Sequence, residues 1–181
     1  IGISAAYKGA DVLQSYFGNI TRIDKKGVID LVTEADVRSE EKIVSTIRGA
    51  FPDHTILAEE SGLEKGTQDG RWLVDPLDGT TNFAHQVPIF CISIAFATDN
   101  DIRVGIVLNP INGELFTATR NMGAQLNGNP IQVSSTARVL DSLLVTGFPY
   151  NVREMFDPII TRYASCLRAA QGIRRLGSAA L

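Results

Sequence analysis

Carboxylate side chains stand at the ends of three predicted elements, where they could bind a cation together. Asp75 and Asp78 flank a proline at the end of the apolar run 71–77, and Glu59 follows another apolar run. Asp36 lies in the first turn of a predicted helix. Converging carboxylates repel one another and raise each other's pKa unless a cation shares them. If the two runs pair as strands, the pattern predicts a site for a hard divalent cation, above all Mg²⁺.

Each of these acids also has a purely structural interpretation. Asp75 and Asp78 could form an ordinary polar turn after a strand, and Asp36 could serve only the helix dipole. Glu60, which follows Glu59, could be a solvated neighbour or a group that supports the ligands. The spacing of the acids taken together favours the metal site over these separate interpretations.

A phosphate group could bind directly after the second of these runs. Gly79, Thr80 and Thr81 begin a short predicted helix, and the first N–H groups of a helix form an anion site. A cation on one side and backbone amides on the other would hold a phosphate monoester. The alternative is an ordinary capped turn.

Hydrophobic periodicity predicts the scaffold that positions these residues. A first helix is expected over residues 2–18, and a second begins where Thr33 precedes Asp36 by three residues and ends near Gly49. Short turns separate the later apolar runs, which predicts an antiparallel meander and an α+β fold. The strand-like runs are residues 55–61, 71–77, 90–97, 102–109 and 114–120.

A second, α/β-like unit is expected to begin near residue 140. The apolar run 142–148 is followed by a predicted helix from about residue 152 to 170. The chain is therefore divided into an N-terminal α+β unit, residues 1–140, and the start of a C-terminal α/β unit, residues 141–181. Because the sequence stops at the apolar stretch GSAAL, the second unit is expected to be truncated here.

Composition narrows the class of protein. The chain has 181 residues, of which 44% are hydrophobic and 20% charged, with a formal net charge of −3. No basic field favours nucleic acid or a membrane surface as a partner. The two cysteines, Cys91 and Cys166, lack the spacing of a zinc site or a disulfide framework, so a reducing, cytoplasmic location is expected.

Four motifs together resemble the inositol monophosphatase family of lithium-sensitive, magnesium-dependent phosphatases, whose superfamily includes fructose-1,6-bisphosphatase. They are DLVTEAD at 30–36, AEES at 58–61, WLVDPLDGTTNF at 72–83 and GIRRLGSAA at 172–180. The resemblance implies an α-β-α-β-α layered sandwich, two or three Mg²⁺ ions at each site, and a homodimer. It also implies hydrolysis of a small phosphate monoester, with inositol monophosphate as the first candidate substrate.

The resemblance assigns roles to matching residues. Glu59 and Asp75 would bind a first Mg²⁺ together with the carbonyl of Leu77, and Asp75 with Asp78 would bind a second. Asp36 and Thr80 would orient and deprotonate the attacking water. The assigned groups are Asp36, Thr80 and Glu59 for catalysis, Glu59, Asp75, Leu77 and Asp78 for metal, and Asp78, Gly79, Thr80, Thr81 and Ala179 for phosphate or substrate.

Two further residues are weaker matches, and one family motif is missing. Lys25 matches a lysine near the metal site, although Lys26 competes with it, and Glu60 is an additional candidate. Family members continue to a W-D-x-A segment whose aspartate completes the second metal site. This chain ends before that segment, so missing residues are expected.

Two alternatives stay open beside the leading hypothesis. Related phosphatases act on fructose 1,6-bisphosphate, histidinol phosphate or 3′-phosphoadenosine phosphates with a similar metal centre. From a different class, the chain could be a non-catalytic regulatory protein that kept the fold. The acids argue against the second alternative, because a scaffold has no physical need to hold several carboxylates together.

Overall fold

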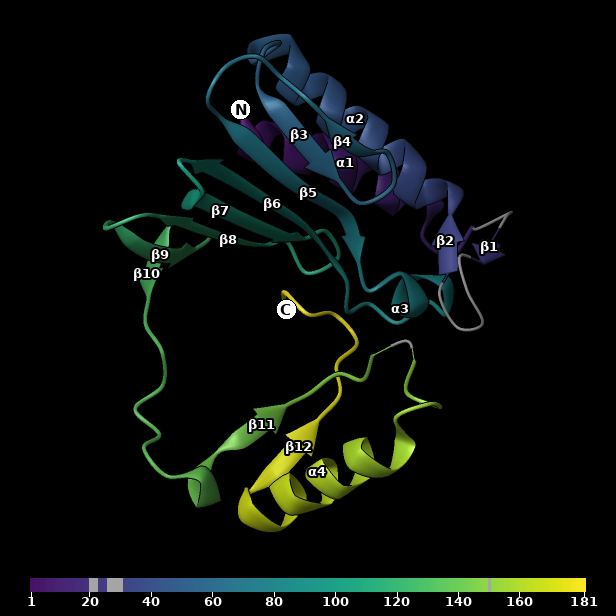
Figure 1. Ribbon diagram of the computed structural model, residues 1–181, viewed down its shortest axis with the longest axis vertical. Helices are drawn as coiled ribbons and strands as arrows, with labels where there is room; N and C mark the ends of the chain where they lie inside the picture. The colour runs from purple at the N-terminus through teal and green to yellow at the C-terminus, as the bar shows by residue number, and fades with distance from the viewer. Residues whose placement is uncertain (20–22, 26–30, 150) are drawn as a thin grey trace.

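A computed structural model of the chain describes residues 1–19, 23–25, 31–149 and 151–181. Its centre is an eight-stranded sheet with strand order β10-β9-β8-β7-β6-β5-β3-β4 (Figure 1). Neighbouring strands in this sheet are antiparallel, except β3 and β5, which run parallel. The strands are β3 (Thr55–Ala58), β4 (Gly62–Glu64), β5 (Arg71–Asp78), β6 (Cys91–Thr98), β7 (Asp101–Asn109), β8 (Glu114–Thr119), β9 (Gly123–Leu126) and β10 (Asn129–Ile131).

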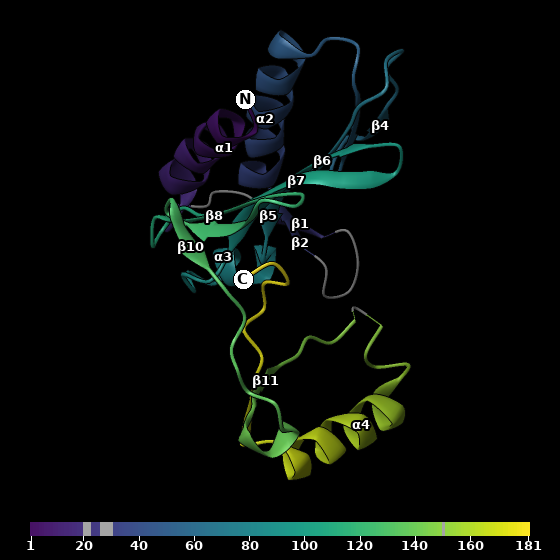
Figure 2. The ribbon, with the colours of Figure 1, turned by 90° about the vertical axis from the view of Figure 1, so that its left-hand side faces the viewer.

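Two helices, α1 (Gly2–Tyr16) and α2 (Glu34–Ala50), cover one face of this sheet (Figure 1, Figure 2). The two helices can approach closely because Gly9 of α1 has no side chain. A Cβ atom at this position would lie 2.8 Å from Ile43 and 2.9 Å from Ser39 of α2. Apolar side chains fill the space between the helices and the sheet. The core includes Leu13, Ile43, Ile47, Ile56, Trp72 and Ile94.

The start of α2 is fixed by a capping box. The Thr33 side chain binds the backbone of Asp36, and the Asp36 carboxylate accepts the Thr33 N–H at 2.8 Å. Before this helix, β1 (Ile23–Lys25) pairs antiparallel with β2 (Leu31–Thr33). The predicted helix start is therefore confirmed.

The α+β layered class and the antiparallel meander are confirmed, whereas the ends of some elements were misplaced and some short strands were missed. The first helix ends at Tyr16 rather than residue 18. The run 55–61 is a strand only to Ala58, because the next three residues form a turn that leads into β4. The strands β4, β9 and β10 are three or four residues long, too short to give a periodic pattern, and were not predicted.

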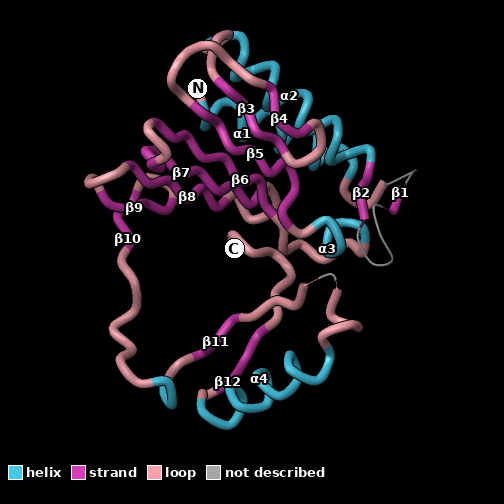
Figure 3. Tube along the Cα trace, in the orientation of Figure 1, coloured by secondary structure: helices cyan, strands magenta, loops and turns pink. Residues whose placement is uncertain are grey.

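The residues after β10 form a separate group of elements. A short 3₁₀ turn, η1 (Val139–Asp141), precedes β11 (Leu143–Val145), and β11 pairs parallel with β12 (Gly172–Arg174). Helix α4 (Phe156–Ala169) connects the two strands and begins later than residue 152, because residues 151–155 form turns and a bend. After β12 the chain returns toward the large sheet and ends beside α3 (Thr80–Ala84) and the end of β5 (Figure 1, Figure 3).

Within the described ranges, none of the helices combines the length and the apolar character that a membrane span requires.

Candidate metal and phosphate site

The parallel pairing of β3 and β5 brings Glu59 and Asp75 together. Ala58 lies opposite Val74 in the register, and the Glu59 N–H donates to the Val74 carbonyl at 3.1 Å. The next residues on the two strands are therefore neighbours at one edge of the sheet. An open groove of about 450 Å³ adjoins them, lined by Leu57, Ala58, Glu59, Leu73, Val74, Asp75, Ser93 and Ala95.

The carboxyl group of Asp75 holds a proton more tightly than a carboxyl group in water does. Burial is the largest cause, and the charge of Glu59 and a hydrogen bond with its carboxyl group follow. The charge of Asp78 adds to them, and the Leu77 N–H, which donates to Asp75 at 3.1 Å, opposes them. Together they raise the pKa of Asp75 from 3.8 to about 8. A shared proton relieves the repulsion between the carboxylates, and a divalent cation would relieve it further.

This shift predicts how the stability of the metal-free protein depends on pH. Between pH 3.8 and about 8, folded Asp75 keeps a proton that the unfolded chain has released. Because the folded state binds more protons there, the free energy of unfolding should fall as pH rises through this window. Urea denaturation in a chelating buffer measures the profile, and Asp75→Asn should flatten it. An unchanged slope in this variant would contradict the assignment.

A β-bulge in β5 places Asp78 on the same side of the sheet as Asp75. Asp75 lies opposite Ser93 and Asp78 opposite Cys91, so Pro76 and Leu77 stand against a single residue of β6. Residues three apart on a regular strand point to opposite faces, whereas the extra residue of a bulge reverses the alternation. The bulge therefore explains how an Asp-Pro-Leu-Asp sequence presents both carboxylates to one side.

The carboxylate of Asp78 is bound by the segment near the end of the chain. Ser178 donates its hydroxyl to Asp78 at 2.7 Å, and the N–H groups of Ala179 and Ala180 donate at 3.0 and 2.6 Å. The Cys91 thiol lies 3.7 Å from the same carboxylate, and burial raises the pKa of this thiol to about 12. Cys91 is therefore a neutral neighbour of Asp78.

Asn82 of α3 holds this segment in place, a role that the sequence analysis missed. Its amide donates to the carbonyls of Leu176 and Ile89, both at 2.7 Å. Gly177 adopts a positive φ of 91°, and a Cβ atom there would lie 2.8 Å from the Asn82 amide. A glycine is therefore required where the segment passes over α3.

Asp36 and Thr80 are hydrogen-bonded across the site. The Thr80 hydroxyl lies 3.1 Å from Asp36 and 3.1 Å from the Leu77 carbonyl, and Asp36 is only 1% exposed. Burial is the main cause that raises the pKa of Asp36, against the hydrogen bonds that it accepts from Thr33 and Thr80. The pair therefore combines a positioned hydroxyl with a carboxylate of increased basicity.

The turn that begins α3 depends on Gly79. This residue has a φ of 105°, and a Cβ atom would lie 3.1 Å from the Ile89 carbonyl oxygen and 3.2 Å from the Phe90 Cβ. Its carbonyl accepts the N–H of Phe83. Thr80 and Thr81 are the first residues of the helix, so their N–H groups have no partner within it.

Two polar residues on the buried face of α2, which the sequence analysis missed, also contact the site. Ser39 donates its hydroxyl to the carbonyl of Pro76 in the bulge at 3.2 Å. Glu40 accepts the N–H groups of Glu60 and Ser61 in the turn after β3. A sequence signal existed, because Asp36 and Glu40 follow the same helical spacing as the buried residues Ile43 and Ile47.

The predicted residues are brought together in two adjacent groups, one formed by Glu59 and Asp75 and the other by Asp36 and Thr80. In the part of the chain that the structure describes, no three His, Cys, Asp or Glu side chains are grouped closely enough to hold a metal ion by themselves. The donors that are present, carboxylates that share a proton and a nearby carbonyl, are the hard oxygen ligands that suit Mg²⁺.

The remaining predicted residues lie at the edge of the site or outside it. Glu60 is half-buried, and its charge contributes to the raised pKa of Asp36. The amide of Ala179 is bound to Asp78. The prediction for Lys25 concerns a side chain outside the described part of the structure, although its backbone pairs with Leu31.

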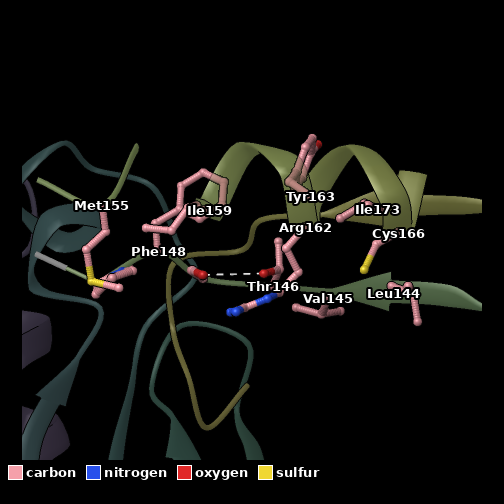
Figure 4. A pocket seen from close by; sticks show the side chains of 12 residues that line it. Leu144, Val145, Thr146, Phe148, Met155, Ile159, Arg162, Tyr163, Cys166 and Ile173 are labelled. Atoms are coloured by element: carbon pink, nitrogen blue, oxygen red, sulfur yellow. Dashed lines mark hydrogen bonds between the residues drawn. The ribbon is translucent and has the colours of Figure 1, made fainter. Parts of the chain in front are cut away.

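An apolar cavity lies elsewhere, between β11 and α4 (Figure 4). It has a volume of about 280 Å³ and contains no carboxylate. Its lining residues are Leu144, Val145, Thr146, Gly147, Phe148, Pro149, Met155, Ile159, Arg162, Tyr163, Cys166 and Ile173. This cavity therefore lacks the oxygen ligands that distinguish the site on the large sheet.

The sequence is similar to those of known proteins. A sequence model of the inositol monophosphatase family matches residues 1–181. The inositol-1-monophosphatase of Synechocystis is 47% identical over 176 residues, which are 96% of this chain and 61% of that protein. The Nus factor SuhB of Escherichia coli K12 is 42% identical over 185 residues, which cover 100% of this chain and 69% of that protein. The chain thus spans less than two thirds of the length of the first relative.

Solved structures have the same fold. The extragenic suppressor protein suhB from Bartonella henselae superposes with a TM-score of 0.92 at 36% identity, covering 98% of this chain and 69% of that one. The inositol monophosphatase from Anabaena gives a TM-score of 0.86 at 42% identity, covering 99% and 66%. These similarities support the α+β layered class.

Proposed function

The chain belongs to the inositol monophosphatase family, and on that premise we propose that it is a Mg²⁺-dependent phosphatase of small phosphate monoesters, with inositol monophosphate as the first substrate. The observation that carries the proposal is the carboxyl pair of Glu59 and Asp75, which the parallel pairing of β3 and β5 brings together. Burial, and after it the charge of Glu59, raises the pKa of Asp75 in this pair. Two adjacent carboxylates at a groove are favourable where a cation binds between them.

The proposed ligands of the first Mg²⁺ are Glu59, Asp75 and the carbonyl of Leu77. Asp75 and Asp78 would contribute to a second ion, and two or three ions are proposed in all. Bound Mg²⁺ supplies Lewis-acid stabilisation of phosphate oxygens and lowers the pKa of a water molecule. The bulge supports this assignment, because it puts Asp75 and Asp78 on one side of the sheet.

Asp36 and Thr80 are the proposed base for the attacking water. Thr80 is hydrogen-bonded to Asp36 at 3.1 Å, so its hydroxyl can donate to this carboxylate while its oxygen accepts a proton from water. The raised pKa of Asp36 makes it a stronger base near neutral pH. Because Thr80 and Asp36 are hydrogen-bonded to each other without substrate, the proposed base is held in place before the substrate binds.

The N–H groups of Gly79, Thr80 and Thr81 are proposed to bind the phosphate. We also propose that residues 1–140 carry the metal ligands and that residues 141–181 begin a second unit, which contributes the segment around Ala179. The hydrogen bonds from this segment to Asp78 support a site that both parts of the chain help to build.

One relative favours a second candidate function. The Escherichia coli protein with 42% identity is named a Nus factor, so this chain could share a regulatory role. The hydrogen-bonded Asp36 and Thr80 favour the phosphatase, because a binding role alone does not require them. The two functions predict different results in an assay of phosphate release.

We expect Mg²⁺-dependent release of phosphate from a panel of monoesters, fastest from inositol monophosphate, when the full chain is assayed. The panel also contains fructose 1,6-bisphosphate, histidinol phosphate and 3′-phosphoadenosine phosphate. Lithium is expected to inhibit the reaction. Faster release from another ester would reassign the substrate, and no release from any ester would favour the regulatory role.

A further inference from the structure

We infer that Glu40 is a positioning residue for the metal-binding carboxylate of Glu59, through its hydrogen bonds to the backbone that follows β3. This inference rests on the proposed function and adds a residue that touches neither metal nor substrate. Glu40 lies on α2, one helical turn after Asp36, and reaches the turn formed by Glu59, Glu60 and Ser61.

The Glu40 carboxylate is buried and fully engaged with this turn. Glu40 is only 4% exposed. One oxygen of its carboxylate accepts the Glu60 N–H at 2.7 Å, and the other accepts the Ser61 N–H at 2.8 Å. Burying a carboxylate is costly unless hydrogen bonds compensate for lost hydration. Two charge-assisted bonds to neighbouring amides provide this compensation and fix the backbone at both residues.

The backbone of Glu59 is thereby held from two sides. Its own N–H donates to the Val74 carbonyl of β5 at 3.1 Å, and the next N–H along the chain donates to Glu40 of α2. The first bond sets the position of Glu59 relative to β5, which carries Asp75. The second prevents the turn from moving away from the sheet, so the separation of the two carboxyl groups depends on both.

Helix α2 is a suitable frame for this role because its buried face contacts three parts of the site. Asp36 binds Thr80 of α3, Ser39 binds the Pro76 carbonyl in the bulge, and Glu40 binds the turn after β3. The three side chains lie within about one turn of one helix. A rigid helix therefore sets the relative positions of the parts that carry the proposed ligands.

The test uses Glu40→Gln, with Glu41→Gln as the matched control. Glutamine keeps the shape of the side chain, but its NH₂ group faces one of the two backbone N–H groups and cannot accept from it. Glu41 is the next residue on the same helix, and its exposed carboxylate binds Arg38 instead of the site. Glu40→Asp retains the charge on a side chain that is too short to reach both amides.

We expect Glu40→Gln to weaken Mg²⁺ binding by roughly 10–100-fold, the range found for groups that orient metal ligands. Calorimetric titration of the full chain with MgCl₂ measures the affinity. Hydrogen exchange of the metal-free protein should show faster exchange at Glu60 and Ser61 in Glu40→Gln. The kcat at saturating Mg²⁺ should recover most of the wild-type value. Glu41→Gln should match the wild type in each measurement.

Wild-type Mg²⁺ affinity and unchanged exchange in folded Glu40→Gln would overturn the inference. If that variant does not fold, Glu40→Asp carries the test, with the same directions of change expected and their absence overturning it. Failure of the proposed function would look different, since the wild type would bind Mg²⁺ without releasing phosphate from any ester. Titration and exchange would then still decide the role of Glu40.

Discussion

Replacing Glu59 with glutamine is expected to lower kcat/KM for phosphate release by roughly 10³-fold or more at a fixed millimolar Mg²⁺ concentration, since the reaction then loses most of the stabilisation that the ion supplies. Glutamine has the shape of glutamate but lacks the charge with which Glu59 would bind the ion beside Asp75, at the ends of β3 and β5. The metal-free fold should be retained, because the amide oxygen of glutamine can still accept a hydrogen bond from the protonated carboxyl group of Asp75.

The control for this variant is Glu64→Gln on the neighbouring strand β4. Glu64 is exposed and binds Arg48 rather than any proposed ligand, so this variant should keep both activity and Mg²⁺ dependence. Thermal denaturation of both variants without metal separates a loss of fold from a loss of metal binding. A folded Glu59→Gln protein with the wild-type rate at the same Mg²⁺ concentration would remove Glu59 from the metal site.

Replacing Thr80 with alanine is expected to lower kcat by roughly 10²–10⁴-fold, the range for loss of general-base assistance, with a much smaller change in KM. Alanine removes the hydroxyl that is hydrogen-bonded to Asp36 but keeps the backbone N–H proposed to bind phosphate. Asp36→Asn should produce a similar loss. The double variant should be little worse than either single one, because residues that act as a unit are not additive.

Two control measurements test whether the losses of rate come from the Asp36–Thr80 pair. Asp36 also caps α2 through Thr33, so its replacement is expected to cost about 1 kcal/mol of stability, and the folded fraction of Asp36→Asn must be measured. Thr80→Ser restores a hydroxyl and should recover most of the rate. Multiplicative losses in the double variant, or a large change in KM with kcat unchanged, would show that Asp36 and Thr80 do not act together.

Much of the site could be predicted from local sequence because local rules produce it. The apolar runs before Glu59 and Asp75 indicate strands, and their pairing alone makes the two carboxyl groups neighbours. Thr33 and Asp36 form the capping box that their spacing predicts. The place of Glu59, Asp75 and Asp36 at the end of an element is therefore visible in the order of residues within that element.

The features that escaped prediction depend on contacts between elements far apart in the chain. The bulge beside Asp78 is defined by how β5 pairs with β6. The sequence Asp-Pro-Leu-Asp alone does not indicate that two of its residues stand opposite a single residue of β6. Glu40 reaches amides about twenty residues further along the chain, and Asn82 binds a carbonyl more than ninety residues away. A charged residue on the apolar face of α2 was the available signal for Glu40, because a carboxylate is rarely buried without a partner.

The central claim, that the Glu59 and Asp75 carboxyl groups bind Mg²⁺, is tested most directly by calorimetric titration of the full chain with MgCl₂ in two buffers of different ionisation enthalpy. We predict saturable binding near neutral pH with release of a proton, since the shared proton that accompanies the raised pKa of Asp75 must leave when a cation binds. Both the affinity and the proton release should decrease in Glu59→Gln. Absence of binding, or an identical isotherm and proton release in this variant, would contradict the claim.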